Sequence, residues 1–559
     1  MRMPRRPGLW VFAILLGSYA YVWQSRDWNS ASRLMLTYAL VDRGTVTING
    51  LEDQTHDRAF FRGRYYTDKL PGYSLVAAVP YAAAKTILRL PDHPRNVKGF
   101  AYWAADYWVV LGTSGLFTAL SGVLLGGLAR ELGCGPRRSA LVGLAYGLAT
   151  PAYAYATMAY GHQTAAFALL AAFALLWRSD APRQALRSGV AGFLASYAAV
   201  IELGVGPISA ILGFYLLAQV LGGRRKPSTL GDFGVGAVIP LLVLLGYNQL
   251  AYGSPWDMGY FHHTTKIFAD VHSEANPLGL RSPEVRRVLT LLFGRYRGLT
   301  FYAPIVVLVP FGLVALVRRR YWGMATVSAA AMGAVFAVNL SYPEWTGGWS
   351  TGPRLLVPLL PFAMLPVAGL LARGMAWSFA VATALAVGGG VLMLLFVGVG
   401  GRIPQYYADP LVQVVWPLWR GGSVPEWEAP FTRNLFQAVL PNAVAALPAG
   451  LKGLQFAPLV IAQMAAIVLM SRSLAPPCGG TPPGSRGETP TSNLGVDHQQ
   501  NNGGEHQEAQ DPRAEPQGVH PDPGPRLVAR GGVDQADRHD QGEHKPVDVD
   551  LDRCQRNHA

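Results

Sequence analysis

The chain has 559 residues, of which 50% are hydrophobic and only 14% are charged. A soluble protein of this length would carry about a quarter charged residues, so the composition excludes an ordinary soluble globular protein. Apolar stretches of membrane-spanning length recur up to about residue 472, which predicts an all-α, polytopic helical membrane protein.

The net charge is +13, and the chain has three cysteines, Cys134, Cys478 and Cys554. In a membrane protein, such positive charge gathers in cytoplasmic loops beside anionic lipids. The sequence has no basic patch interleaved with aromatic residues, so we expect no nucleic-acid partner. The cysteines form no framework, so we expect neither a disulfide nor a metal site, and no cofactor.

Residues 1–24 have a basic start, with Arg2, Arg5 and Arg6, and an apolar core over about 9–23. No small-x-small cleavage site follows, which predicts an uncleaved signal anchor. Residues 25–72 form a large first extracytoplasmic loop, too charged for lipid and longer than a turn needs. Its part at 30–42 has apolar residues at helical spacing and predicts an amphipathic helix on the membrane face.

Residues 73–473 hold the remaining spans of the predicted bundle. Together with the first span they give twelve or thirteen, at about 73–88, 107–129, 139–158, 164–177, 189–203, 205–221, 233–251, 301–317, 323–340, 355–372, 377–399 and 454–471. The segment 73–88 either crosses the bilayer or only dips into it. The positive-inside rule puts the basic clusters on the cytoplasmic side, at Arg137-Arg138, Arg183/Arg187, Arg224-Arg225-Lys226, Arg318-Arg319-Arg320 and Arg373.

Residues 474–559 differ from the rest of the chain. They are rich in Pro, Gly, Gln, Asp and His and poor in large apolar residues. Such a segment cannot bury enough surface to offset its chain entropy, which predicts a disordered hydrophilic tail. A frame error or a misplaced stop is the alternative.

The first loop carries Asp57, Asp68 and Lys69 within one short polar run. A carboxylate near a lipid surface can serve as general base toward an acceptor hydroxyl. A lysine can neutralise a leaving phosphate as a point charge. The alternative is a solvated loop with surface ion pairs, which composition alone favours.

Several other residues at the predicted outer ends of spans are candidates, each with a plainer alternative. His162 follows Tyr-Gly at a span end, where a histidine commonly caps or packs. Glu202 stands in an apolar run, where a carboxylate is costly without a cavity or partner; its alternative is interfacial snorkelling. Arg354 is a phosphate-type donor at a helix start, after a loop rich in Gly and Trp that otherwise reads as an aromatic belt. The run 295–298, Arg-Tyr-Arg-Gly, is expected to add outward cations.

The order of these motifs resembles a known family, the bacterial GT-C integral-membrane glycosyltransferases related to protein O-mannosyltransferases and lipid A aminoarabinose transferases (glycosyltransferase 39-like). The resemblance covers about residues 8–472. Its most specific blocks are Asp68-Lys69-Leu70-Pro71-Gly72 and Gly352-Pro353-Arg354, and it also rests on Tyr160-Gly161-His162, Glu202, Tyr252-Gly253-Ser254-Pro255, Tyr296-Arg297-Gly298-Leu299 and Gly347-Gly348-Trp349-Ser350.

The resemblance implies a polyprenyl-phosphate-linked sugar as donor, an acid of the first outer loop as base, and cations that hold the lipid phosphate. Lys69 matches the family's lysine before the loop-closing proline, and Arg354 is expected to bind the same phosphate. The acid departs from the pattern, because Asn29-Ser30 stands where aminoarabinose transferases carry Asp-Glu. The base then comes from Asp27, Asp57 or Asp68, and we favour Asp57, with Asp68 next.

We therefore expect a GT-C-type glycosyltransferase of the inner (cytoplasmic) membrane that works on its extracytoplasmic face. Its partners would be the lipid-linked donor, membrane lipids and a cell-envelope acceptor, which is a glycan, lipid or protein. His162 lies where related enzymes carry an acid in a second outer loop, and we expect His162, Glu202, Tyr66 and Trp349 to contact substrate. The alternatives are a transporter or flippase for a lipid-linked or small solute, although no inverted repeat is found, and a degenerate relative that binds lipid-linked sugars without turnover.

Overall fold

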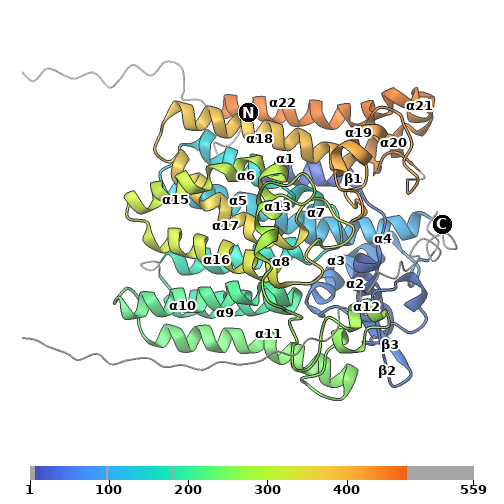
Figure 1. The fold of residues 1–559 in the computed structure, drawn as a ribbon, viewed down its shortest axis with the longest axis horizontal. Coiled ribbons are helices and arrows are strands. Elements are labelled where there is room, and N and C mark those ends of the chain that lie inside the picture. Colours follow the sequence, from blue (N-terminus) through green and yellow to red (C-terminus); the bar gives the residue numbers. More distant parts are fainter. Residues whose placement is uncertain (1–6, 96–98, 179–181, 428, 475–559) are drawn as a thin grey trace, which may run out of the picture. The chain divides into compact units, whose positions relative to one another are not determined.

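The computed structural model describes residues 7–95, 99–178, 182–427 and 429–474. Within these residues the protein is built of helices, with two small antiparallel sheets beside them (Figure 1). The predicted basic cluster at Arg2, Arg5 and Arg6 lies outside the described residues, as does the predicted tail after Leu474.

Seven helical stretches are long and apolar enough to cross a membrane: Phe100–Glu131, Leu203–Leu221, Ser228–Tyr252, Trp322–Ser341, Arg354–Leu371, Ala376–Gly398 and Ala449–Ser473. Three shorter apolar helices accompany them: Pro7–Ala20, Gly161–Trp177 and Pro304–Arg318. The predicted all-α architecture of a multi-pass membrane protein is confirmed.

Most of the predicted spans correspond to helices of the structure. The first half holds α1 (Pro7–Ala20), α2 (Trp28–Arg43), α3 (Gly72–Leu88), α4 (Phe100–Val110), α5 (Leu116–Glu131), α6 (Pro136–Leu148), α7 (Ala152–Ala156), α8 (His162–Trp177), α9 (Gln184–Ile201), α10 (Gly206–Leu221) and α11 (Ser228–Tyr252). The second half holds α12 (Lys266–Ala269), α13 (Val288–Phe293), α14 (Leu299–Tyr302), α15 (Val309–Arg318), α16 (Trp322–Ser341), α17 (Leu360–Leu371), α18 (Ala376–Gly398), α19 (Trp416–Trp419), α20 (Leu435–Val439), α21 (Pro441–Ala446) and α22 (Ala457–Ser473).

The structure differs from the expected spans at several places. The segment 301–317 is divided into α14, a 3-10 turn over Pro304–Leu308 and α15. The segment 139–158 is not one helix but two, α6 and the short α7, separated at Thr150-Pro151. Proline explains the break, because its ring removes a backbone donor and disfavours helix in the residue before it. The segment 73–88 is the 17-residue helix α3, with Pro80 inside it, and it is not among the stretches that meet the length and hydropathy needed to cross a membrane.

Helix α2 fills the region where a helix was predicted in the first loop, and its ends follow from local chemistry. Asp27 caps the N-terminus, since its side chain accepts from the Ser30 backbone N–H while the Ser30 hydroxyl accepts from the Asp27 N–H. Gly44 ends the helix in the left-handed region with φ 62°. Residues 30–39 are all buried, so α2 belongs to the protein interior and leaves little apolar surface for lipid.

Two short antiparallel sheets lie within and between the loops. Strands β2 (Arg58–Phe61) and β3 (Arg64–Thr67) form an antiparallel hairpin in which Arg58 pairs with Thr67. Strands β1 (Val22–Trp23) and β4 (Arg433–Asn434) pair antiparallel and join the end of the first helix to the last outer loop. The hairpin register therefore places the residues before Arg58 beside those after Thr67.

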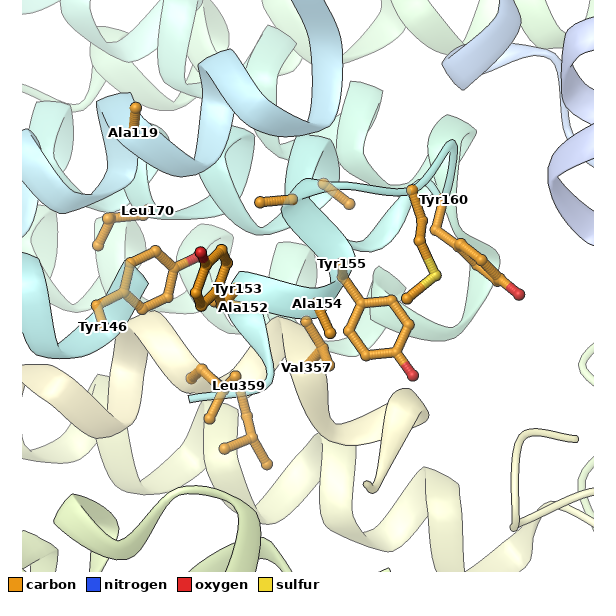
Figure 2. Close-up of a cluster of buried hydrophobic side chains, with 14 of the residues drawn as sticks. Ala119, Tyr146, Ala152, Tyr153, Ala154, Tyr155, Tyr160, Leu170, Val357 and Leu359 are labelled. Atoms are coloured by element: carbon orange, nitrogen blue, oxygen red, sulfur yellow. The ribbon is translucent and has the colours of Figure 1, made fainter. Parts of the chain in front are cut away.

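The core beneath the outer loops is rich in tyrosine. Figure 2 shows Tyr146, Tyr153 and Tyr155 between α8 and the stretch 354–371, with Val357 and Leu359 facing them. At the opposite ends of the helices the basic residues gather: Arg138 donates to the carbonyl of Gly374 (2.5 Å), and Arg137 to that of Ser471 (3.3 Å). The start of α6, which carries these two arginines, thus lies beside the start of α18 and the end of α22.

Candidate active site

The hairpin gathers the carboxylates of the first loop around Lys69. Asp57 precedes β2 and Asp68 follows β3, so the strand register brings both side chains to the open end of the hairpin. The Lys69 Nζ lies 2.9 Å from Asp57 Oδ2 and 2.5 Å from Asp68 Oδ2. We call these three residues the lysine cluster; in it, one ammonium group faces two carboxylates.

Asp68 is the most enclosed member of the lysine cluster. It is 2% exposed, and it accepts a hydrogen bond from the Ser32 hydroxyl (2.9 Å) in addition to that from Lys69. The His263 Nε2 lies 3.6 Å from Asp68 Oδ2, while the His263 Nδ1 accepts from the backbone N–H of Thr265. That backbone contact assigns the proton of the neutral imidazole to Nε2, which faces the carboxylate.

Burial and charge set the ionisation of this cluster. Burial acts to raise the pKa of Asp68, but Lys69, His263 and Ser32 outweigh it and hold the pKa below the ordinary value. Burial acts to lower the pKa of Lys69, whereas Asp57 and Asp68 raise it well above the ordinary value. Burial is also the main reason that the pKa of His263 is lowered. At neutral pH the ammonium and the Asp68 carboxylate are thus charged, and His263 is neutral.

A second group of charges lies where α2, α8 and α9 meet the loop before Arg354. The Arg33 Nη2 donates to Glu202 Oε1 at 2.7 Å, and His162 Nδ1 lies 3.6 Å from the same oxygen. The Arg354 guanidinium lies over the Tyr160 ring, 5.0 Å from its centroid, and the Tyr160 and His162 rings stack with centroids 5.7 Å apart. We call Arg33, His162, Glu202 and Arg354 the arginine cluster.

The arginine cluster has nitrogen atoms that no protein group satisfies. Arg33 Nη1, His162 Nε2 and Arg354 Nε are buried without a hydrogen-bond partner in the described part of the chain. Arg33 is 2% exposed and His162 is 4% exposed. Buried polar atoms are normally paired, so three orphans in one cluster need an explanation.

Asp27 joins the arginine cluster through Tyr160. The Tyr160 hydroxyl donates to Asp27 Oδ2, and no ion pair to Asp27 is found among the described residues. Burial acts to raise the pKa of Asp27, but the charge of Arg402 and the hydrogen bonds from Ser30 and Tyr160 outweigh it and lower the pKa. Asp27 is therefore an ionised, partly exposed carboxylate at the positive end of α2.

Two glycines let these segments approach each other. A Cβ on Gly161 would lie 2.4 Å from Glu202 Oε1, and a Cβ on Gly72 would lie 2.7 Å from the Val200 carbonyl. The glycine of Tyr-Gly-His therefore makes room for the carboxylate, and the last residue of the Asp-Lys-x-Pro-Gly block packs against the end of α9. Both motifs have a close-packing reason beside any chemical one.

The predicted site residues divide into those that the fold gathers and those that it does not. Asp57, Asp68 and Lys69 lie together, and His162, Glu202 and Arg354 lie together. Tyr66 is 4% exposed and packs against the Tyr252 ring, 5.2 Å between centroids. Trp349 is partly buried and has no ring contact or hydrogen bond with either cluster in the described structure.

The sequence analysis missed Arg33, Tyr160 and His263 as individual residues. Arg33 is the one charged residue among the apolar positions of the predicted helix 30–42 before Asp42, and that isolation was a usable signal. Tyr160 and His263 had no such signal, because they reach Asp27 and Asp68 only through long-range packing. No group of three or more His, Cys, Asp or Glu residues that could hold a metal ion occurs in the ranges that the structure covers.

The sequence matches no protein-family model and no curated protein. Among solved structures, the chain aligns with ArnT from Cupriavidus metallidurans bound to undecaprenyl phosphate, at 13% identity and a TM-score of 0.42, over 83% of this chain and 75% of that chain. The apo structure of the same protein aligns at 15% identity and a TM-score of 0.43 over the same shares. Similarity at this level carries no conclusion about activity, which has to come from the residues themselves.

Proposed function

We propose that this chain is a membrane glycosyltransferase that moves a sugar from a polyprenyl-phosphate donor to a hydroxyl of an acceptor on the extracytoplasmic side. The observation that carries the proposal is the arginine cluster, with its orphaned nitrogens on Arg33, His162 and Arg354. A buried N–H group without an acceptor costs free energy until a ligand supplies one. Phosphate is the anion that the guanidinium fork fits best.

The balance of charge supports an anionic ligand. Arg33 and Arg354 face two carboxylates, those of Glu202 and Asp27, and the charge of Arg402 also acts on Asp27. Glu202 bonds to Arg33 through one guanidinium nitrogen only. Arg354 forms no salt bridge among the described residues. With Arg402, three guanidiniums stand against two carboxylates, at helix ends opposite those that carry the basic clusters, where the motif resemblance expects a lipid phosphate.

The geometry shifts our preference for the base from Asp57 to Asp27. Asp57 contacts Lys69, whose charge it compensates, and Asp68 is enclosed by its three partners. Asp27 is ionised, partly exposed and hydrogen-bonded to the tyrosine whose ring carries Arg354. Asp27 is thus linked through Tyr160 to a cation that would hold the donor phosphate.

In the proposed reaction, the acceptor oxygen attacks the anomeric carbon as the bond from that carbon to the phosphate oxygen breaks. The acceptor proton goes to Asp27, and the bonding electrons leave with the lipid phosphate. Arg33 and Arg354 stabilise the charge that grows on the leaving phosphate, which is the larger part of the rate enhancement in such displacement reactions. Lys69 is not assigned to the phosphate, because Asp57 and Asp68 already compensate its charge.

The test is transfer of a radiolabelled sugar from a polyprenyl-phosphate donor in membranes that contain the wild-type chain. We expect transfer by the wild type and none by membranes without it. Movement of the lipid across the bilayer without sugar transfer would instead support the transporter, and donor binding without turnover would support the degenerate relative. Either result would overturn the proposal.

The choice of base is tested by two matched substitutions, Asp27→Asn and Asp57→Asn, which keep size and remove charge. General-base catalysis contributes about 10²–10⁴-fold to rate, so we expect a loss in that range for Asp27→Asn only. Glu426→Gln is the control, since Glu426 is an outer-loop carboxylate held by the hydroxyls of Tyr406 and Tyr407. A loss confined to Asp57→Asn would return the role to Asp57 and leave the transferase proposal intact.

A further inference from the structure

Arg297 is the largest fully buried side chain of the described structure, with 0% exposure. The sequence predicted that the run 295–298 adds cations to the outer face, and within that run the fold buries Arg297 completely. No carboxylate lies within salt-bridge distance of it among the described residues. A buried guanidinium without a counter-ion is costly unless several acceptors surround it, so its neighbours identify its purpose.

Those acceptors are backbone carbonyls of the loop that leads to Arg354. Arg297 Nε donates to Thr346 O at 3.1 Å, Nη2 to Gly348 O at 3.0 Å, and Nη1 to Ser350 O at 3.1 Å. The carbonyls of every second residue, 346, 348 and 350, thus converge on the three nitrogens of one planar guanidinium group. Only arginine among the side chains offers donors in that fixed arrangement.

Other contacts fix the second half of the same loop. The Ser350 N–H donates to the Ile403 carbonyl at 3.0 Å, and the Tyr155 hydroxyl donates to the Thr351 carbonyl at 3.2 Å. A Cβ on Gly347 would lie 3.1 Å from Arg354 Cβ and 3.5 Å from its Nε. The loop backbone that Arg297 holds therefore also packs directly against the side chain of Arg354.

We infer that Arg297 is a positioning residue: it holds the loop 346–350 in the one shape that presents the Arg354 guanidinium, over Tyr160, to the phosphate of the donor. The inference rests on the proposed function, since it gives Arg354 an anion to bind. Arg297 itself does not touch the donor. Its effect is to pre-organise a cation, so that the binding of phosphate does not have to order the loop.

The first test compares Arg297→Gln with Arg225→Gln in the full chain, purified in detergent. Arg225 is the matched control: it is 4% exposed and also donates to backbone carbonyls, those of Leu175 and Leu176, but at the opposite ends of the helices. The probe is undecaprenyl phosphate, titrated to obtain its Kd, with thermal unfolding measured in parallel. We expect Arg297→Gln to weaken binding at least tenfold, and Arg225→Gln to lower thermal stability without changing the Kd.

Turnover separates positioning from a general loss of structure. With Arg297→Gln we expect the KM for the lipid-linked donor to rise more than kcat falls, because the fault lies in holding the phosphate. Arg297→Lys keeps the charge without the fork, so it should recover less than half of the lost affinity. Full recovery by lysine would show that charge alone matters and would overturn the inference.

The second test covers the case in which Arg297→Gln does not fold. Gly347 and Gly348 have φ angles of 73° and 68°, so alanine strains the backbone similarly at both. A Cβ at 347 presses on Arg354, whereas a Cβ at 348 meets nothing within 4 Å. We expect Gly347→Ala to weaken undecaprenyl phosphate binding at least tenfold relative to Gly348→Ala.

The outcomes distinguish the two proposals. If the wild type binds no undecaprenyl phosphate, both the proposed function and the inference fail. If the wild type binds it, and Arg297→Gln or the two glycine variants bind it equally well, only the inference fails.

Discussion

The lysine cluster and the arginine cluster have the same kinds of side chains but opposite balances. In the lysine cluster one ammonium meets two carboxylates, and the carboxylate of Asp68 is saturated by its neighbours. In the arginine cluster the one ion pair joins Arg33 to Glu202, Arg354 forms none, and three nitrogens have no partner within the described chain. The first is closed by its own ion pairs, and the second is the cluster that we propose binds an anion.

The difference teaches that the residue type which draws attention in a sequence is not always the one left free in the fold. Lys69 belongs to the most specific motif, yet its ammonium is already neutralised. Arg33 belongs to no motif and ends with an unpaired nitrogen. The clusters can be separated experimentally, because one should respond chiefly in stability and the other chiefly in activity.

The largest effect is expected on the stability of the protein when the lysine cluster is disrupted. Lys69→Met leaves Asp57 and Asp68 facing each other without a cation, and removing one partner of a buried ion pair costs about 3–5 kcal/mol. Thermal unfolding of the purified chain measures the loss. The triple variant with Asp57→Asn and Asp68→Asn should recover much of it, and failure to do so would mean that the three charges are not coupled.

A slightly smaller effect, on activity, is expected in the arginine cluster. Arg354→Gln removes a donor to the charge that develops on the leaving phosphate, and the loss of one such donor costs about 10²–10³-fold in rate. Arg354 forms no salt bridge in the described structure, so the thermal unfolding of the Arg354→Gln variant should stay close to that of the wild type. Sugar transfer and unfolding are measured on the same samples. A large stability loss with little change in transfer would reverse our assignment of the two clusters.

A ligand bound at the arginine cluster should stabilise the folded protein by about 2–3 kcal/mol. Undecaprenyl phosphate at about a hundred times its Kd stabilises the folded state by about 2.7 kcal/mol. We expect the corresponding rise in unfolding temperature for the wild type and no rise for Arg33→Gln. Inorganic phosphate at the same concentration is the control for the lipid part. Equal protection of the wild type and Arg33→Gln would place the phosphate elsewhere.

The smallest effect is a pH dependence of stability at Asp68. Its folded-state pKa is lowered from the ordinary value, so its ionised form stabilises the fold at neutral pH. This contribution to the free energy of unfolding is lost as the pH falls from about 3.9, the ordinary pKa of an unfolded-state aspartate, toward the lower folded-state pKa. Its size is about 1.4 kcal/mol for each unit between the two pKa values. Unfolding curves from pH 7 to pH 3 should be flatter for Asp68→Asn. Parallel curves for both proteins would contradict the assigned shift.

Much of the architecture followed from the sequence, because the signals for it are local. Apolar length predicted most of the spans, and the helical spacing of apolar residues predicted a helix at 30–42, where the structure has α2. The break at Thr150-Pro151 also had a local signal, the proline, which the hydropathy of the segment hid. The helix at 72–88 was foreseen as a segment whose crossing was in doubt.

The balance of the two clusters had no local signal. The proximity of Asp57 to Lys69 depends on the register of β2 with β3, and that of Arg33 to Glu202 joins residues 169 positions apart. The sequence marked Arg297 as one of several outer-face cations and gave no sign of its partners, the carbonyls of a loop some fifty residues away.

By itself, then, the sequence determined a multi-pass helical membrane protein with a charged first loop, and it named most of the charged residues that gather there. Only the tertiary structure decided which of those charges neutralise one another and which are left unpaired. The physical reason is range: hydropathy and capping act over one helix turn or one span, while the partner of a buried charge is chosen by whichever distant segment packs against it.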